Sequence, residues 1–338
     1  MTLAIVGTGL VSPLGLTPAQ HAFFARARLG MNPPSAFLDS KGDPAPVHHC
    51  PWLGAKLPIA ERLAALGQRA VEGALGAVVG RSKEALLFAC LSAPRPGLTQ
   101  ADRDVATRAV AGATSTTVHQ VRSGAASFFD ALSQAEQLVQ GERGRIVLVV
   151  AIDSFVSLEM VRSGLTMPAA TWVREPPALS EASAAVAVMN GAAARELGVP
   201  VLGTIHHAGT RMGTGTDDDD ATVDGSALTA LIEEIPDLDG PIRRAYGQDR
   251  VDLLRQREWT YGAARNADRF HLHLSTSSIE VKTGRVGAAA GAVQLVHGIA
   301  AERHYAGIEH EAGVGPFLAW AISQDGRRGI CVAQAAGE

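Results

Sequence analysis

Hydrophobic positions in the central part of the chain change their spacing at well-defined points. Residues 116–121 are β-branched and partly alternating, which is typical of a buried strand. Between residues 125 and 139 the apolar side chains recur at helical spacing, and Gly141 ends that pattern. Residues 145–153 form an almost unbroken apolar run, as in a strand buried on both faces. The pattern predicts a strand, a sharp turn, a helix and a second strand.

The turn that joins the first of these strands to the helix is a favourable place for a nucleophile, because the free amides of a helix N-terminus stabilise an anion. Here the turn carries Val121, Arg122 and Ser123. Ser123 is also a good candidate for capping the helix. The order of the elements therefore suggests an enzyme, whereas the residues at the turn do not.

The same kinds of segment occur throughout the chain, and their order approximately repeats. The other predicted strands are residues 2–11, 85–91, 180–190, 200–210, 242–246, 270–278, 317–323 and 329–333. The other predicted helices are residues 18–28, 59–79, 101–110, 226–235, 251–265 and 287–301. A seam near residues 191–199 divides the chain into two similar α/β halves, 1–195 and 196–338, packed as one structural unit.

Composition narrows the functional classes. Hydrophobic residues make up 46% of the sequence and charged residues 19%, which is typical of a tightly packed soluble protein. The net charge of −4, with no basic cluster, argues against nucleic-acid binding. The cysteines, 3 in number and widely spaced, favour a reducing compartment. The apolar opening is too short and too glycine-rich for a signal or membrane segment, so we expect a cytoplasmic protein.

Four segments resemble parts of the β-ketoacyl synthases, a family with the thiolase fold. They are residues 5–17, residues 122–154 with the central turn and its helix, residues 180–188, and residues 275–294 with the sequence STSSIEVKTGRVGAAAGAVQ. The resemblance implies an α/β thiolase-like fold with two pseudo-repeated halves in a layered αβαβα arrangement. It also implies dimerisation through the sheet of the first half, as a homodimer or as a heterodimer with a second thiolase-like subunit.

The family's catalytic residues do not carry over to the matching positions. The cysteine three residues before the turn glycine is replaced by Val121, and the histidine after the Thr-Gly pair of the C-terminal loop is replaced by Arg285. The family's lysine maps onto Glu280, and the nearest candidate for its other histidine is Tyr261. The family's terminal Gly-Phe-Gly-Gly-type loop is replaced by CVAQAAGE, residues 331–338.

These replacements predict a pseudoenzyme. An aliphatic side chain cannot form the acyl-enzyme on which condensation depends. An arginine stays protonated, so it cannot act as a neutral base. We therefore expect no catalytic residue, no cofactor and no metal at the family's positions.

Cys90 and Ser123 are the remaining candidate nucleophiles. Cys90 ends a predicted strand and could reach the central turn, although a small buried residue is the favoured interpretation. Ser123 together with His119 could support acyl transfer or hydrolysis. Residues four apart across a turn need not face each other, so we favour a capping role for Ser123.

Three further motifs are incomplete as binding sites. Gly7-Thr8-Gly9 lacks the third glycine of a dinucleotide fingerprint and suits a tight strand exit. The segment His48-His49-Cys50 has no second ligand cluster at a recognised spacing. The run Asp217–Asp220 lacks the spacing of a calcium-binding loop. We expect ordinary loops and a tight turn at these places.

Four histidines lie in or beside predicted strands. His206 and His207 are at a strand end, and His271 and His273 would share one face of a strand. Hydrogen-bonded structural roles are the favoured interpretation, and a functional role is the alternative.

The predicted helix at residues 251–265 carries the most distinctive cluster of the second half. Its members are Arg255, Arg257, Glu258, Trp259 and Arg265. The simpler interpretation is a surface helix with ion pairs and one buried tryptophan. The alternative is a partner-facing patch, since Trp and Arg are enriched at binding hot spots.

The sequence therefore predicts a non-catalytic thiolase-fold protein that acts by protein contact. By analogy with inactive relatives, and because the chain is shorter than typical members, the first hypothesis is an adaptor or chaperone-like accessory of a bacterial type VI secretion effector. A second is a chain-length-factor-like subunit of a ketosynthase heterodimer. A third is an acyltransferase or thioesterase that uses Ser123 or Cys90.

Overall fold

The computed structural model describes residues 3–27, 37–38, 42–76, 78, 85–114, 118–121, 124–142, 144–163, 178–213, 223–248, 253–305 and 315–337. In this part of the chain the strands form a 10-stranded mixed sheet in the order β3-β2-β4-β5-β1-β6-β10-β9-β7-β8. The strands are β1 (Leu3–Val11), β2 (Leu86–Leu91), β3 (Val118–Val121), β4 (Val147–Ser154), β5 (Glu181–Asn190), β6 (Gly203–Met212), β7 (Ile242–Tyr246), β8 (Phe270–Ser277), β9 (Phe317–Ile322) and β10 (Arg327–Ala335).

The second half of the sheet repeats the first. Counted outward from the centre, the order is β1-β5-β4-β2-β3 on one side and β6-β10-β9-β7-β8 on the other. In the first half the pairs β1–β5 and β5–β4 are antiparallel, and β4–β2 and β2–β3 are parallel. In the second half β6–β10 and β10–β9 are likewise antiparallel, and β9–β7 and β7–β8 are parallel. The halves meet where Leu3–Ile5 of β1 pairs antiparallel with Gly203–Ile205 of β6. The predicted pseudo-repeat is confirmed.

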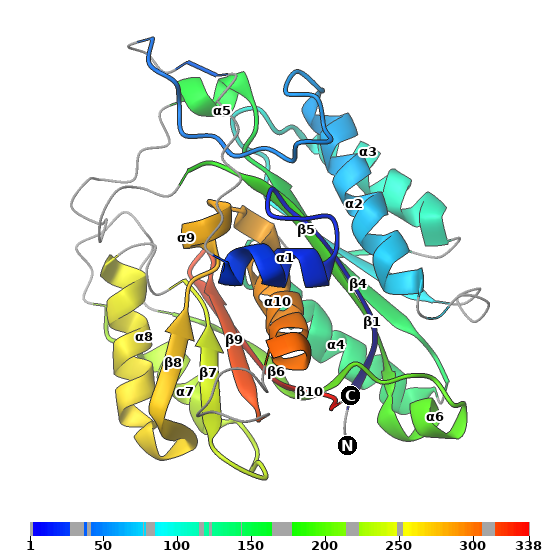
Figure 1. The fold of residues 1–338 in the computed structure, drawn as a ribbon, viewed down its shortest axis with the longest axis vertical. Helices are drawn as coiled ribbons and strands as arrows, with labels where there is room; N and C mark the ends of the chain where they lie inside the picture. Colours follow the sequence, from blue (N-terminus) through cyan, green and yellow to red (C-terminus); the bar gives the residue numbers. More distant parts are fainter. Residues whose placement is uncertain are drawn as a thin grey trace.

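Helices cover the two halves in layers. They are α1 (Pro18–Arg26), α2 (Ile59–Gly76), α3 (Gln100–Thr114), α4 (Ser127–Gly141), α5 (Leu158–Arg162), α6 (Gly191–Glu196), α7 (Ser226–Glu233), α8 (Leu253–Arg265), α9 (Glu280–Thr283) and α10 (Ala290–Tyr305), with 3-10 turns η3 (Ala267–Arg269) and η4 (Gly287–Ala289). Figure 1 shows α2 and α3 on one side, α7 and α8 on the other, and α4 and α10 between the two halves.

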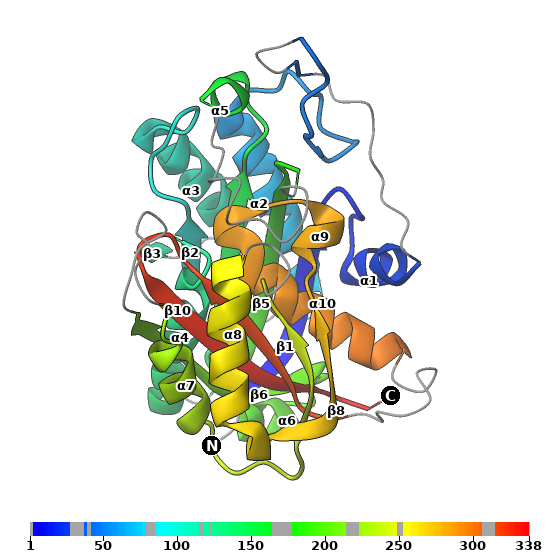
Figure 2. The same cartoon turned by 90° about the vertical axis from the view of Figure 1, so that its left-hand side faces the viewer.

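Three hydrophobic clusters correspond to these layers. The largest unites α4 and α10 with the inner faces of both half-sheets. A second lies between the first half-sheet and α2 and α3, and a third between the second half-sheet and α7 and α8. Figure 2 shows α7 and α8 in front of the second half-sheet. The αβαβα arrangement expected from the resemblance is therefore confirmed.

The central helix α10 is buried along almost its whole length, from Ala290 to Glu302. Its sequence is apolar on every side and rich in small residues, which is the pattern of a helix enclosed by other elements. Gly298 lets the ring of Phe317 approach, because a Cβ there would lie 2.4 Å from a ring carbon. Small residues in α10 thus allow both half-sheets to pack closely against it.

The Gly7-Thr8-Gly9 motif has a packing role inside β1 and does not form a turn at the end of the strand. A Cβ on Gly7 would lie 1.9 Å from the carbonyl oxygen of Ala74, and one on Gly9 would lie 1.8 Å from that of Ala70. These glycines therefore admit the backbone of α2 against the strand.

Side-chain hydrogen bonds define the start of α1. The hydroxyl of Thr17 accepts the N–H of Gln20, and the Gln20 side chain accepts the N–H of Leu16, so a capping box begins α1. Helix α4 begins at Ser127 with Ala126 as its N-cap, later than predicted. The proposed cap Ser123 lies outside the described residues. Among the described helices, none is both long enough and apolar enough to cross a membrane.

Candidate functional site

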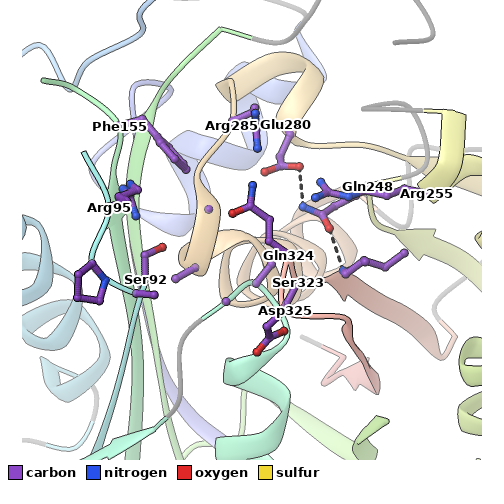
Figure 3. A pocket seen from close by; sticks show the side chains of 17 residues that line it. Ser92, Arg95, Phe155, Gln248, Arg255, Glu280, Arg285, Ser323, Gln324 and Asp325 are labelled. Carbon is purple, nitrogen blue, oxygen red and sulfur yellow. Dashed lines mark hydrogen bonds between the residues drawn. The ribbon is translucent and has the colours of Figure 1, made fainter. Parts of the chain in front are cut away.

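A cavity of about 170 Å³ lies at the start of α4, where the ends of several strands meet (Figure 3). The segments that follow β2, β4, β7 and β9 all contribute, together with α8, α9 and η4. The carboxyl ends of parallel strands commonly form binding sites in α/β sheets. The lining residues are Ser92, Ala93, Pro94, Arg95, Gly124, Ala125, Phe155, Gln248, Arg255, Glu280, Arg285, Gly287, Ala288, Ile322, Ser323, Gln324 and Asp325.

The floor of the cavity is the turn before α4. Gly124 has φ +118°, and a Cβ there would lie 2.5 Å from the hydroxyl oxygen of Ser323. The same hydroxyl oxygen accepts the N–H of Ala126 at 2.8 Å. Glycine is therefore required at this position both by its backbone conformation and by the contact with the β9–β10 turn.

Asp153, at the end of β4, fixes one wall. Its carboxylate accepts hydrogen bonds from the hydroxyl of Ser92, from Arg95 Nη2 at 2.5 Å, and from the N–H groups of Ser154 at 2.9 Å and Ala288 at 2.8 Å. This fully buried carboxylate thus joins the ends of β2 and β4 to η4. Its charge is balanced by Arg95, as a buried carboxylate requires.

The opposite wall is held by an amide and a carboxylate. Gln248 Nε2 donates to Glu280 Oε2 at 2.8 Å, and Gln248 Oε1 accepts the N–H of Ile322 at 2.9 Å. Glu280 Oε1 also accepts the N–H of Val286 at 3.3 Å. These bonds fix the loop that carries Arg285.

Arg285 enters the cavity from this loop and is 8% exposed. Its guanidinium lies 5.7 Å from the ring centre of Phe155, and that of Arg95 lies 4.2 Å from the same ring centre. Both contacts are within cation–π range. The aromatic ring therefore separates two positive charges.

The lining has few groups for covalent chemistry. Among the described residues, no cysteine, histidine, lysine or tyrosine lines the cavity. The hydroxyls among the described lining residues are those of Ser92, which donates to Asp153, and Ser323, which accepts from Ala126. A serine becomes a nucleophile when a neighbouring base takes its proton, and no imidazole stands among the lining residues that the structure describes. The described lining is suited to binding by charge and hydrogen bonds.

The structure brings some of the predicted positions together. Val121 ends β3 three residues before Gly124, and its backbone lies opposite Cys90 of β2. Arg285 and Glu280, which occupy the positions of the family's histidine and lysine in the resemblance, both line the cavity.

Tyr261 is not at the cavity. It lies on α8, is 42% exposed, and stacks with the guanidinium of Arg265. The residue that β7 brings to the cavity is Gln248, two positions after the strand ends at Tyr246.

The terminal segment CVAQAAGE is also not a cavity loop. Its described part lies mainly in β10, and the preceding turn, with Gln324 and Asp325, lines the cavity. The sequence reasoning also did not identify Arg95 and Asp153 as site residues. A usable signal was present, since each follows or ends an apolar strand on the carboxyl side.

Cys90 is fully buried and does not line the cavity. Burial raises the pKa of its thiol to about 12, although a hydrogen bond with Ser127 acts in the opposite direction. A nucleophilic cysteine needs an accessible thiolate, so this position suits a structural residue. Ser123 lies outside the described residues, as does the run Asp217–Asp220, and for His119 only the backbone is described.

The five residues proposed as an alternative partner patch do not share one exposed face. Arg255, Glu258 and Trp259 are buried, whereas Arg257 and Arg265 are exposed. Glu258 accepts two hydrogen bonds from Arg328, at 2.7 and 2.8 Å, and Trp259 stacks on Trp320 at 5.1 Å. The ion pair and the buried tryptophan agree with the simpler interpretation of this helix, because β9 and β10, distant in sequence, supply partners for its inner face. Binding of a partner at this helix stays a prediction.

The histidines singled out by sequence do not gather into a site. His206 and His207 are half-buried on β6, and burial lowers the pKa of each. The rings of His271 and His273 lie 5.8 Å apart on β8, at the far edge of the sheet.

His48 binds the carbonyl oxygen of Thr283 through Nδ1, and the N–H of Cys50 donates to Glu181. In the described part of the chain, no group of three or more His, Cys, Asp or Glu side chains is arranged to hold a metal ion.

No protein-family model matches the chain, and no curated protein matches it by sequence. Solved structures do. The ishigamide ketosynthase/chain length factor has a TM-score of 0.70 and 22% identity, with 100% of both chains covered. The type II polyketide synthase structure AntDE:AntF, a ketosynthase with its acyl-carrier protein, has a TM-score of 0.76 and 14% identity, with 99% of both chains covered.

A ketosynthase from module 1 of the bacillaene synthase of Bacillus amyloliquefaciens FZB42 has a TM-score of 0.72 and 12% identity. The match covers 100% of this chain and 76% of that ketosynthase. Identities this low establish the fold alone. The fold is the thiolase-like fold of the ketosynthases.

Proposed function

We propose that the protein is a non-catalytic thiolase-fold subunit that acts by pairing with a second thiolase-fold subunit, in the manner of a chain length factor. The observation that carries this proposal is the cavity at the turn before α4. Arg285 lies there, and the described lining contains neither a thiol nor an imidazole. With Val121 three residues before Gly124, the chain has no cysteine at the family's position for acyl transfer.

The lengths of the matched proteins support a role as a chain-length-factor-like subunit over the other roles that depend on protein contact. The alignments with the ishigamide ketosynthase/chain length factor and with AntDE:AntF cover essentially all of both chains. The bacillaene ketosynthase extends well beyond this chain. The names of the first two proteins describe assemblies in which a ketosynthase works with another subunit. An adaptor role in type VI secretion stays a prediction, since none of these names refers to secretion.

The pairing of the two edge strands, β3 and β8, indicates which edge of the sheet meets the partner. At the β8 edge, the pairing with β7 jumps from Ile242–Phe270 to Arg244–Ser275, so β8 has extra residues at this point and its pairing is irregular. Bulges of this kind protect an edge strand from pairing with another chain. At the β3 edge, consecutive residues pair regularly with β2, from Val118 to Val121. The resemblance also implies dimerisation through the first half, so we place the partner at β3.

Acyl transfer or hydrolysis is the rival function. It would need Cys90 or Ser123 as nucleophile. Cys90 is buried with a raised pKa and does not reach the cavity, which weighs against a thiol mechanism. The serine mechanism makes a clear prediction, namely a covalent acyl adduct on the purified protein.

Co-expression with a ketosynthase from the same genome tests the proposal. We expect a stoichiometric heterodimer by light scattering, and no added mass on this chain after incubation with an acyl thioester that labels the ketosynthase. Hydrogen–deuterium exchange should slow in residues 118–121 on complex formation and stay unchanged in residues 270–277. An acyl adduct on this chain, or condensation by this chain alone, would refute the proposal.

A further inference from the structure

Helix α1 lies across α10 (Figure 1) and is held there by a small apolar surface. Its buried residues are His21, Ala22 and Ala25. Ala22 packs with Ala300 and Ala301 of α10, and Arg26 lies over the ring of Tyr305 at 4.9 Å. An alanine buries little apolar area, so these contacts hold α1 less firmly than the larger side chains of the three main clusters hold α2, α4 and α7.

The polar centre of this interface is a pair of buried imidazoles. The rings of His21, from α1, and His297, from α10, lie 5.3 Å apart. His21 Nδ1 lies 2.7 Å from the hydroxyl oxygen of Ser12, which follows β1. Among the described residues, neither His21 Nε2 nor His297 Nδ1 has a hydrogen-bond partner, and both atoms are buried.

Protonation is therefore unfavourable while α1 is in place. An imidazolium donates at both nitrogens, so a charged ring here would hold a buried N–H without an acceptor. Burial, followed by the charge of Lys282, lowers the pKa of His21 to about 3. Burial, with the charges of His21 and Lys282, lowers the pKa of His297 well below its usual value. A ring that water reaches when α1 moves away regains an ordinary pKa.

The other groups around the pair do not favour a charge on it. Lys282 is a cation on α9. The ring of Tyr246, on β7, lies 5.3 Å from that of His297, and Arg244 is on the same face of that strand. The carboxylate of Glu302, further along α10, is paired with Arg244 at 3.0 Å and accepts the hydroxyl of Tyr246 at 3.3 Å.

We propose that α1 is a flap that opens in acid, and that His21 and His297 take up the protons that keep it open. The open form binds protons that the closed form excludes, so its population grows as the pH falls below about 6.5. Opening uncovers the surface of α10 at Ala300 and Ala301 and leaves the three main clusters folded. The flap does not depend on the proposed pairing with a second subunit, because neither histidine lines the described cavity or lies on β3.

Hydrogen–deuterium exchange of the whole protein at low urea concentrations, corrected for the pH dependence of the intrinsic exchange rate, tests the flap. Protection of residues 18–26 should fall at least about 30-fold between pH 7.5 and pH 5.0, the factor for one histidine whose pKa rises from about 3 to 6.5 on opening. It should not respond to urea, since local opening exposes little surface. Residues 127–141 of α4 should be better protected at both pH values and lose protection as urea is added.

Variants assign the response to the two rings. The double variant His21→Leu/His297→Leu should remove the pH response of α1 at whatever stability it has, because the readout is a ratio of protection at two pH values. His21→Gln alone should lower that ratio by roughly tenfold or more. His304→Gln is the matched control, since His304 is exposed on α10, and it should keep the full response.

Several results would overturn the flap. One is a protection of α1 that is equal at the two pH values after correction. Another is protection that falls with urea in parallel with that of α4, because α1 would then open only when the whole molecule unfolds. An unchanged pH response in the double variant would exclude the two histidines. Heterodimer formation, measured at pH 7.5 on the same preparations, is decided separately from each of these outcomes.

Discussion

Two fully buried imidazoles pack against each other where α1 meets α10. The rings of His21 and His297 lie 5.3 Å apart, and the ring of Tyr246 lies 5.3 Å from that of His297. His21 Nδ1 is 2.7 Å from the hydroxyl of Ser12. Lys282 adds a nearby positive charge. Burial and the charge of Lys282 favour neutral rings.

The consequence is a pH-dependent stability. Burial lowers the pKa of His21 to about 3, and burial with the charges of His21 and Lys282 lowers the pKa of His297 well below its usual value. In the unfolded chain both titrate near pH 6.5, so between that pH and about 3 the unfolded state binds more protons. The contribution of these histidines to the free energy of unfolding should therefore be complete above pH 6.5 and be lost below it, by roughly 2 kcal/mol at pH 5 for His21 alone.

Urea denaturation at several pH values measures this effect. His297→Leu should reduce the slope of unfolding free energy against pH between 5 and 6.5, whatever it does to stability at pH 7.5. His304→Gln is the control, because His304 is exposed on the same helix and should leave the slope unchanged. An unaltered slope in His297→Leu would contradict the assignment.

For single residues of the candidate site, the sequence alone identified Val121 and Arg285, because each occupies one position of a short motif of the resembled family. It did not predict Arg95, Asp153 or Gln248 as site residues. Their roles come from partners far along the chain, such as the N–H of Ala288 for Asp153 and that of Ile322 for Gln248. Residues of this kind have no local signature beyond a polar side chain at the end of an apolar strand.

Helix α2 lies unusually close to β1 because two glycines of the strand face it. Gly9→Ala would place a Cβ 1.8 Å from the carbonyl oxygen of Ala70, a backbone atom that cannot move without shifting the helix. We expect a loss of about 1–3 kcal/mol in unfolding free energy, the usual range for overpacking. Urea denaturation at pH 7.5 measures it.

The matched change is Gly76→Ala at the end of the same helix. A Cβ there meets no atom within 4 Å. Alanine is the better helix former, so this variant should be as stable as the native protein or slightly more stable. Equal stability of the Gly9 and Gly76 variants would show that α2 can move away from β1 at little cost.

The long, periodic elements were predictable because their pattern repeats over several turns or pairs of residues, as in α4 and β4. The short helices α5, α6 and α9 were not, since each is too short to establish a period. Their starts depend on single caps, such as the Ser157 hydroxyl that accepts the N–H of Met160 before α5. For a related reason the sequence left two interpretations open for the cluster on α8, because helical spacing does not show which face meets β9 and β10.

At the scale of the whole molecule, the two halves share one core. Phe129 of α4 belongs to the first half, yet a Cβ on Gly291 of α10 or on Gly329 of β10 would lie 2.9 Å or 2.6 Å from its ring. The largest hydrophobic cluster likewise contains residues of both half-sheets around α4 and α10. Neither half can therefore cover its inner face alone.

The intact chain should accordingly unfold in a single cooperative transition that different probes report at the same urea concentration. Separate expression of residues 1–195 and 196–338 should give chains that bind a hydrophobic dye and lack such a transition, because each exposes the face that the other covers. Co-expression of the two fragments should restore a complex with the native transition, since the cut separates only Glu196, the last residue of α6, from the rest of that helix. If residues 1–195 unfold cooperatively on their own, the first half has a hydrophobic core that is large enough for folding without α10, and the two halves do not depend on each other.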